Sequence, residues 1–165
     1  MGNSVSGRGK VVDWSAALWA GIVSGIVFYI LNIFLIPFVY GGNSATIIRY
    51  LASPILGESI LPPPASLNIQ SLLISIICTI VLSIVFTFVV SYVLHQGGII
   101  LGIVGGALFG LALYFINFNT LTLLVPWLYA LSSPLMMLNH VIFGILAGGL
   151  YETLEVEEYE LWENQ

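Results

Sequence analysis

The sequence predicts an all-α, polytopic membrane protein in which four transmembrane helices form two related helical hairpins with interfacial segments between them. Three observations predict this fold. Residues 59–151 contain no Asp, Glu, Lys or Arg, and a soluble domain of that size could not cover its surface without them. Four stretches of the chain are long and apolar. A spaced pattern of glycine, tyrosine and asparagine also occurs twice.

The predicted spans cover residues 15–40, 71–95, 98–117 and 134–151. A helix needs about 20 apolar residues to cross the hydrocarbon layer, and each stretch meets or approaches that length. Helices are expected because the backbone in lipid must satisfy its own hydrogen bonds, and the sequence lacks the short alternating segments of a membrane barrel. The chain therefore divides into an N-terminal segment (residues 1–13), a transmembrane domain (residues 14–151) and an acidic tail (residues 152–165).

The first span carries the first copy of the repeated pattern. The members of each copy are separated by four, four and three residues; they are Gly21, Gly25, Tyr29 and Asn32, and Gly106, Gly110, Tyr114 and Asn117. Residues at such intervals share one face of a helix. Two further matches follow in the same order, LIPFVY at 35–40 with LVPWLY at 124–129 and LASP at 51–54 with LSSP at 131–134. We therefore predict a duplicated two-helix unit.

The loop after the first span contains a short amphipathic helix. Asn43 or Ser44 can cap it, and its apolar residues fall on one side; they are Ile47, Ile48, Leu51 and Ile55. We expect this helix to lie in the membrane interface. Three consecutive prolines at 62–64 then impose an extended stretch. Residues 118–133 are too apolar for a free loop, so they are expected to be interfacial as well.

The second span has a row of small polar residues at every fourth position, and the third span has a row of glycines. The first row is Ser71, Ser75, Thr79, Ser83, Thr87, Ser91 and His95, and the second is Gly98, Gly102, Gly106 and Gly110. Helices in lipid associate through close backbone approach over small residues and through hydrogen bonds. The turn between these spans, Gln96-Gly97, is minimal. We therefore predict that the second and third spans pack together through these two rows.

The fourth span places His140, Gly144 and Gly148 on one stripe. Counting helical rises puts a set of polar residues at a comparable depth in the outer half of the bilayer: Tyr29, Asn32, Tyr114, Asn117, Asn139 and His140. One interpretation is that these groups hold the bundle together by neutral hydrogen bonds. The other is a small polar site that holds a solute, an ion or a quinone head group, since an ionisable group within a membrane is a functional candidate.

An enzyme is not expected, and neither is a metal site or another cofactor. The two histidines, His95 and His140, lie near opposite ends of their helices, so about 20 Å of bilayer separates them. The spans contain no carboxylate or second thiol that could complete a metal site or a catalytic triad. The glycines lie within helices, which is not the setting of a phosphate-binding loop. A nucleic-acid partner is not expected either.

The two ends of the chain differ in charge. Arg8 and Lys10 precede the first span, which favours a cytoplasmic N-terminus, and four spans return the C-terminus to the same side. After the last span come six glutamates, Glu152, Glu155, Glu157, Glu158, Glu160 and Glu163, interleaved with apolar and aromatic residues. We expect this tail to project into solvent or to contact a basic protein surface.

The fourth span and the end of the third resemble a known group of proteins. The segments are LNHVIFGILAGGLY at 138–151 and GALFG at 106–110. They resemble the small four-helix bacterial inner-membrane proteins grouped as YagU-like, and the likeness covers most of the region from Ala17 to Tyr151. The resemblance implies a multi-pass protein of a prokaryotic inner membrane with this architecture. It implies no biochemical activity, and the acidic tail has no counterpart in that pattern.

Two functions are compatible with the sequence. The first is a non-catalytic membrane protein, either an accessory subunit of a larger complex or a homo-oligomer packed through the glycine rows, because a four-helix bundle cannot bury every such row. The second is a small transporter or channel for a solute or ion, in which two related halves surround the outer polar layer. Against the second stands the absence of any carboxylate or arginine in the spans that could couple or select ions.

Overall fold

Four long helices dominate the computed structural model, which describes residues 7–63, 66–156 and 159–162. The spans long and apolar enough to cross a membrane are Trp14–Tyr40, Ile69–Leu94, Gly98–Leu123 and Pro134–Leu154. The prediction of an all-α, polytopic membrane protein is confirmed. The described part also contains one short two-stranded ribbon, β1 (Gly7–Lys10) with β2 (Tyr159–Trp162).

The α-helices are, in chain order, α1 Trp14–Ile30, α2 Ile36–Tyr40, α3 Ser44–Leu56, α4 Ile69–Leu94, α5 Gly98–Phe115 and α6 Pro134–Leu154. The third span is longer than predicted because α5 continues through a π-helical segment (Ile116–Thr120) and a 3₁₀ turn (Leu121–Leu123). The last helix runs three residues past the predicted end at Tyr151, which brings Glu152 into it.

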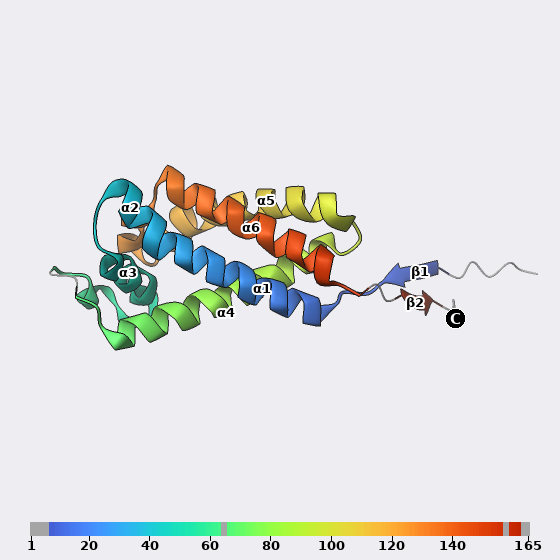
Figure 1. Ribbon diagram of the computed structural model, residues 1–165, viewed down its shortest axis with the longest axis horizontal. Coiled ribbons are helices and arrows are strands. Elements are labelled where there is room, and N and C mark those ends of the chain that lie inside the picture. Colours follow the sequence, from blue (N-terminus) through green and yellow to red (C-terminus); the bar gives the residue numbers. More distant parts are fainter. Residues whose placement is uncertain (1–6, 64–65, 157–158, 163–165) are drawn as a thin grey trace, which may run out of the picture.

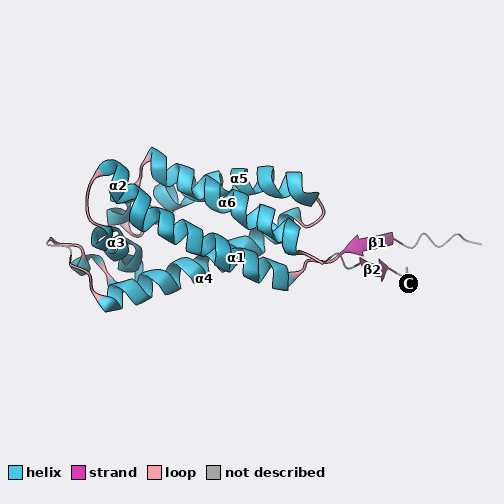
Figure 2. Ribbon diagram, viewed as in Figure 1, coloured by secondary structure: helices cyan, strands magenta, loops and turns pink. Residues whose placement is uncertain are grey.

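The loops gather at the two ends of the bundle (Figures 1 and 2). One end carries β1, β2 and the turn between α4 and α5, and we call it the terminal end. The other end carries α2 and α3, and we call it the α3 end. In Figure 1, α3 is viewed almost along its own axis, so it lies across the long axis of the bundle. Polar backbone groups outside helices are thus kept away from the middle of the spans, as a bilayer requires.

Both copies of the repeated pattern lead into a π-helical segment. Leu31, which begins the first segment (Leu31–Leu35), stands ten residues after Gly21, and Ile116 stands ten residues after Gly106. A π segment changes the register of the backbone hydrogen bonds. The side-chain amides of Asn32 and Asn119 donate to the carbonyls four residues earlier, at 2.8 and 3.1 Å, and so supply hydrogen bonds that lipid cannot.

α1 packs against α4 through its glycines. A Cβ atom at Gly21 would lie 2.8 Å from the Cα of Ile84, and one at Gly25 would lie 2.7 Å from the Cβ of Ser83. The small polar residues of α4 from Ser71 to Ser91 are all buried, and Ser75 shares a 2.8 Å hydrogen bond with Tyr29. The polar row therefore faces protein and not lipid, and α1 is one of its neighbours.

α5 packs against α6, with glycine opposite glycine. A Cβ atom at Gly106 would overlap the carbonyl oxygen of Gly144, and one at Gly144 would overlap the carbonyl oxygen of Gly106. Gly110 lies in the same way against the His140 carbonyl, and Gly102 and Gly148 lie against each other. This is the closest backbone approach in the bundle, and it uses the small-residue packing that membrane helices favour.

The prediction that the second and third spans pack through their two rows is therefore wrong. α4 and α5 touch near their shared turn, where Leu94 lies against Gly105, and farther along where the rings of Phe86 and Phe109 are 6.5 Å apart. The glycine row of α5 packs against α6, and the polar row of α4 packs against α1. A glycine opposite a glycine lets two backbones approach more closely than a glycine opposite a serine or threonine, which favours α6 over α4 as the partner of α5. Gly98 belongs to no row: its φ of +69° serves the turn, and a Cβ there would meet nothing.

α3 and the following loop are held by polar contacts at the α3 end. Asn43 caps α3 by accepting a 2.9 Å hydrogen bond from the amide of Ala45. The Arg49 side chain donates to the carbonyls of Ile60 and Ser66 at 3.0 and 3.1 Å and to the Ser66 hydroxyl at 3.1 Å. This one guanidinium thus ties α3 to the loop that leads to α4, a role that the sequence analysis did not assign to it.

The two ends of the chain meet at the terminal end. Lys10 forms a salt bridge with Glu155, and the Asp13 carboxylate accepts a 3.1 Å hydrogen bond from the amide of Val156. Asp13 also caps α1 by accepting from Ser15 and Ala16, and the hydrogen bond from Ala16 is the main reason why the pKa of Asp13 is lowered. The tail was expected to project into solvent or to contact a basic protein surface, and its described part contacts the chain's own N-terminal segment at Lys10 and Asp13.

Candidate intramembrane binding site

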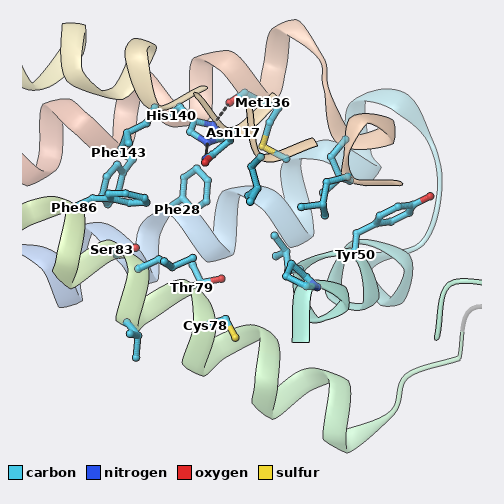
Figure 3. Close-up of a pocket in the computed structure, with 18 of the residues that line it drawn as sticks. Phe28, Tyr50, Cys78, Thr79, Ser83, Phe86, Asn117, Met136, His140 and Phe143 are labelled. Atoms are coloured by element: carbon cyan, nitrogen blue, oxygen red, sulfur yellow. Dashed lines mark hydrogen bonds between the residues drawn. The ribbon is translucent and has the colours of Figure 1, made fainter. Parts of the chain in front are cut away.

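A cavity of about 450 Å³ lies between α4 and α5, which diverge from their shared turn in Figure 1; Figure 3 shows the residues that line the cavity. Its walls come from α4, from α5 and the π segment after it, and from α6, and Phe28 of α1 contributes to its base. At the α3 end it is bounded by α3 and by the segments Leu121–Leu123 and Pro126–Leu131. Its volume falls within the range of roughly 300–1,000 Å³ that small-molecule sites occupy.

The walls of the cavity are mostly apolar, and aromatic rings form much of them. The lining residues are Phe28, Tyr50, Leu51, Pro54, Ile55, Ile77, Cys78, Thr79, Val81, Leu82, Ser83, Phe86, Leu113, Asn117, Phe118, Leu121, Leu128, Leu131, Met136, His140 and Phe143. This set contains no Asp, Glu, Lys or Arg. A ligand with a net charge would therefore lie in a site of low dielectric without a counter-charge.

His140 is the most polar group of the site and is itself fully hydrogen-bonded. Its Nδ1 lies 2.8 Å from the carbonyl oxygen of Met136, which can only accept, so Nδ1 carries the proton and donates. Burial disfavours the charged imidazole, so Nε2 holds a lone pair and accepts from the side-chain amide of Asn117 at 3.1 Å. The imidazole is 5% exposed, and the ring of Phe28 lies edge-on to it at 5.0 Å. These contacts fix a neutral tautomer in one orientation.

Asn117 keeps hydrogen-bonding groups available, whereas both ring nitrogens of His140 are already paired. Because its Nδ2 must donate to the His140 lone pair, its Oδ1 is directed away from the ring. Within the described residues neither that oxygen nor the second amide proton has a hydrogen-bond partner. Asn117 lines the cavity and is only half-buried. It therefore offers one acceptor and one donor to a ligand.

Across the cavity, α4 contributes two hydroxyl groups. Figure 3 shows Thr79 and Ser83 on α4, with Phe28 between them and the pair formed by His140 and Asn117. Neither hydroxyl has a hydrogen-bond partner in the described part of the chain, although both residues are buried. Buried polar groups are normally paired, so unpaired hydroxyls that line a cavity are candidate ligand contacts. Cys78, the single cysteine of the sequence, lies beside them on the wall.

The six polar residues predicted to converge do so only in part. Asn117 and His140 share a hydrogen bond, and the ring of Tyr114 lies 5.6 Å from His140. The hydroxyl of Tyr114 instead shares a 2.9 Å hydrogen bond with Ser132, as that of Tyr29 does with Ser75. Among these six, Asn32 and Asn139 are fully buried and do not line the cavity. The amide of Asn139 has no hydrogen-bond partner among the described residues.

Sequence reasoning missed most of the cavity. Depth along the helices identified Asn117 and His140, and the row at every fourth residue identified Thr79 and Ser83, although as packing residues. Phe28, Phe143 and Cys78 carry no signal in the sequence, because apolar residues in a span look alike whether they face lipid, protein or a cavity. The short helix α3 was predicted, but its position over the site was not.

Comparisons with known protein families, with curated proteins and with solved structures find no match to this chain. The resemblance to the YagU-like proteins therefore stays a prediction.

Proposed function

We propose that this chain is a non-catalytic, multi-pass membrane protein that binds a lipophilic small molecule in the cavity between α4 and α5. The observation that carries the proposal is a cavity at the depth of the spans whose walls are apolar and whose few polar groups keep unused hydrogen-bonding capacity. Apolar cavities with a few convergent polar groups are the usual form of a ligand site. The residues in contact with the ligand would be His140, Asn117, Thr79 and Ser83.

The structure lends less support to the other functions. An oligomer or accessory subunit packed through glycine rows was expected because some rows would be left bare, but Gly21, Gly25 and the glycines of α5 and α6 pack within the bundle. A transporter with one polar layer needs side chains that converge, and here they separate into several pairs. We retain as part of the proposal the duplicated two-helix origin, the cytoplasmic termini and the prokaryotic inner membrane.

The duplication is supported by how each pair of spans is built. Glycines of α1 pack against α4, and glycines of α5 pack against α6, so the first helix of each pair uses its glycines to contact the second. The tyrosine of each pattern forms a hydrogen bond with a serine of its own half, Tyr29 with Ser75 and Tyr114 with Ser132. The π segments begin at the same point of each pattern. Such parallels are what a duplicated unit would produce.

The binding function is tested by filling the cavity. Cys78→Trp places a bulky ring in the wall, and Val89→Trp places the same ring on α4 at an exposed position that does not line the cavity. The full-length protein is purified in mild detergent, and retained small molecules are identified by native mass spectrometry and extraction. We expect a bound lipophilic molecule in the wild type and in Val89→Trp, and its loss in Cys78→Trp.

Equal retention in both variants, with each still folded by thermal melting, would contradict binding in this cavity. Recovery of a stoichiometric membrane-protein companion that survives in both variants, with no small molecule retained, would favour the accessory-subunit function instead.

A further inference from the structure

The chemistry of the cavity lining limits the class of ligand that can bind there. This inference rests on the proposed function. We infer that the ligand is an uncharged lipid whose head group is a flat ring bearing carbonyl or hydroxyl oxygens, the chemistry of quinones and quinols, with its apolar tail extending into the surrounding lipid. The inference depends on three properties of the lining: its charge, its hydrogen-bonding groups and its shape.

The absence of charge excludes the commonest head groups of membrane lipids. The lining contains no acidic or basic residue, and burial of His140 disfavours the charged form of its imidazole. A phosphate, carboxylate or ammonium group would lose its hydration in this cavity and gain no opposite charge. An uncharged head group loses far less hydration free energy on entering the cavity.

The hydrogen-bonding groups lie on two sides of the cavity. Asn117 offers Oδ1 and one amide proton from the side of α5 and α6, and the hydroxyls of Thr79 and Ser83 lie on α4 (Figure 3). A hydroxyl and an amide can each donate or accept, so they suit a carbonyl in one ligand and a hydroxyl in another. A ring with oxygen atoms on two edges could contact both sides. A head group with a single polar atom would leave one side unpaired.

The shape favours a ring over a plain chain. Four phenylalanines line the cavity, namely Phe28, Phe86, Phe118 and Phe143. Aromatic side chains contact a planar ring with stacked or edge-on geometry that a flexible chain cannot exploit to the same extent. On α4 the rim is formed by Ile77, Val81 and Leu82, which are 59%, 52% and 51% exposed and lie midway along a spanning helix. A tail passing this rim would enter the acyl layer.

Three probes with the same ten-carbon tail separate these properties: a decyl-substituted benzoquinone, decanol and decanoate. Dissociation constants are measured by thermal-shift titration of the full-length protein in one detergent, with Cys78→Trp as the blocked form. We expect the benzoquinone to bind at least tenfold more tightly than decanol, decanoate to bind most weakly, and Cys78→Trp to bind none of them.

Two pairs of variants test the hydrogen-bonding groups. Thr79→Val removes a cavity hydroxyl and keeps the shape of the side chain, and Thr87→Val removes a buried hydroxyl of the same row that does not line the cavity. Neither hydroxyl has a hydrogen-bond partner among the described residues, so both variants should fold. We expect Thr79→Val to raise the Kd of the benzoquinone about 2- to 10-fold and Thr87→Val to leave it unchanged. Asn117→Leu should raise it about tenfold. Asn139→Leu should not, since that buried amide has no partner among the described residues and does not line the cavity.

The outcomes distinguish the two proposals. If decanol binds as tightly as the benzoquinone and Thr79→Val has no effect, the ring-bearing class is wrong, while sensitivity to Cys78→Trp would uphold the cavity as a lipid site. If decanoate binds most tightly, an uncharged ligand is excluded. If no probe binds and the purified wild type retains no molecule, the proposed function fails as well.

Discussion

At the scale of single residues, the closeness of the helices depends on missing side chains. Gly106 and Gly144 let two backbones meet at a distance that any Cβ atom would prevent. His140 shows the complementary case, since one of its ring nitrogens is paired with the Met136 carbonyl and the other with the side-chain amide of Asn117. Both arrangements place side chains accurately in a medium that provides no hydrophobic force between helices.

The glycine contact leads to a prediction with an internal control. Gly144→Ala should lower the free energy of unfolding by about 1–3 kcal/mol, because the added methyl group must push α5 away. Gly149→Ala, on the same helix, should cost much less, since its Cβ would meet only the side chain of Ile103, at 3.3 Å, and no backbone atom. Thermal melting in detergent measures both. Equal losses in the two variants would mean that α5 and α6 are not in backbone contact there.

At the scale of elements, α3 closes one end of the cavity and is held in place through Arg49. The amphipathic pattern of α3 predicted a helix, and that pattern is sufficient for the element itself. Its position depends instead on contacts with residues distant in sequence: Trp127 donates a 2.9 Å hydrogen bond to Ser53, and Arg49 binds the loop around Ile60. Such contacts have no periodic signature, which is why the sequence predicted α3 but not what it covers.

The loop contacts lead to the second prediction. Arg49→Met should loosen the segment that the guanidinium holds, because the carbonyl of Ile60 loses its donor. Arg49→Lys should restore little, since a single ammonium group cannot reproduce the several hydrogen bonds of a planar guanidinium. Hydrogen exchange at the amides of residues 58–61 should quicken in both variants, while exchange in α6 stays slow. Unchanged exchange in Arg49→Met would show that the loop is held by other contacts.

At the scale of the whole molecule, two helix pairs are joined along α1 and α6, and the chain ends are fastened together. Phe28 of α1 contacts both His140 and Phe143 of α6, which links the first pair to the second. At the terminal end, Lys10 and Glu155 form a salt bridge with side chains only 11% and 4% exposed. The β1–β2 ribbon continues this contact beyond the spans. The beginning of the first pair is thereby tied to the end of the second.

The salt bridge leads to the third prediction. Lys10→Met should destabilise the protein by about 3 kcal/mol, because the Glu155 carboxylate is left buried without its partner. Exchanging the two charges, in the double variant Lys10→Glu with Glu155→Lys, should recover part of that loss. A double-mutant cycle read by thermal melting measures the coupling. A coupling near zero would show that the ribbon holds the two ends without the ion pair.

The sequence was sufficient for the parts of the fold that depend on local pattern. Apolar length predicted four spans, and the small residues predicted where close packing occurs. The choice of partners was wrong, because the rule that small residues pack together does not say whether Gly106 faces Gly144 or a hydroxyl of α4. For the site, depth predicted that Asn117 and His140 lie together. The cavity itself is a consequence of where α4 and α5 part, and no local pattern encodes that divergence.

The exposed rim on α4 has a consequence for how affinity must be described. A ligand that enters the cavity past Ile77 and Leu82 would come from the acyl chains of the bilayer and not from water. Occupancy would then follow its mole fraction in the bilayer, so diluting the protein with extra phospholipid at constant aqueous volume would empty the cavity. For a molecule that partitions almost wholly into lipid, changing the buffer volume would leave occupancy the same.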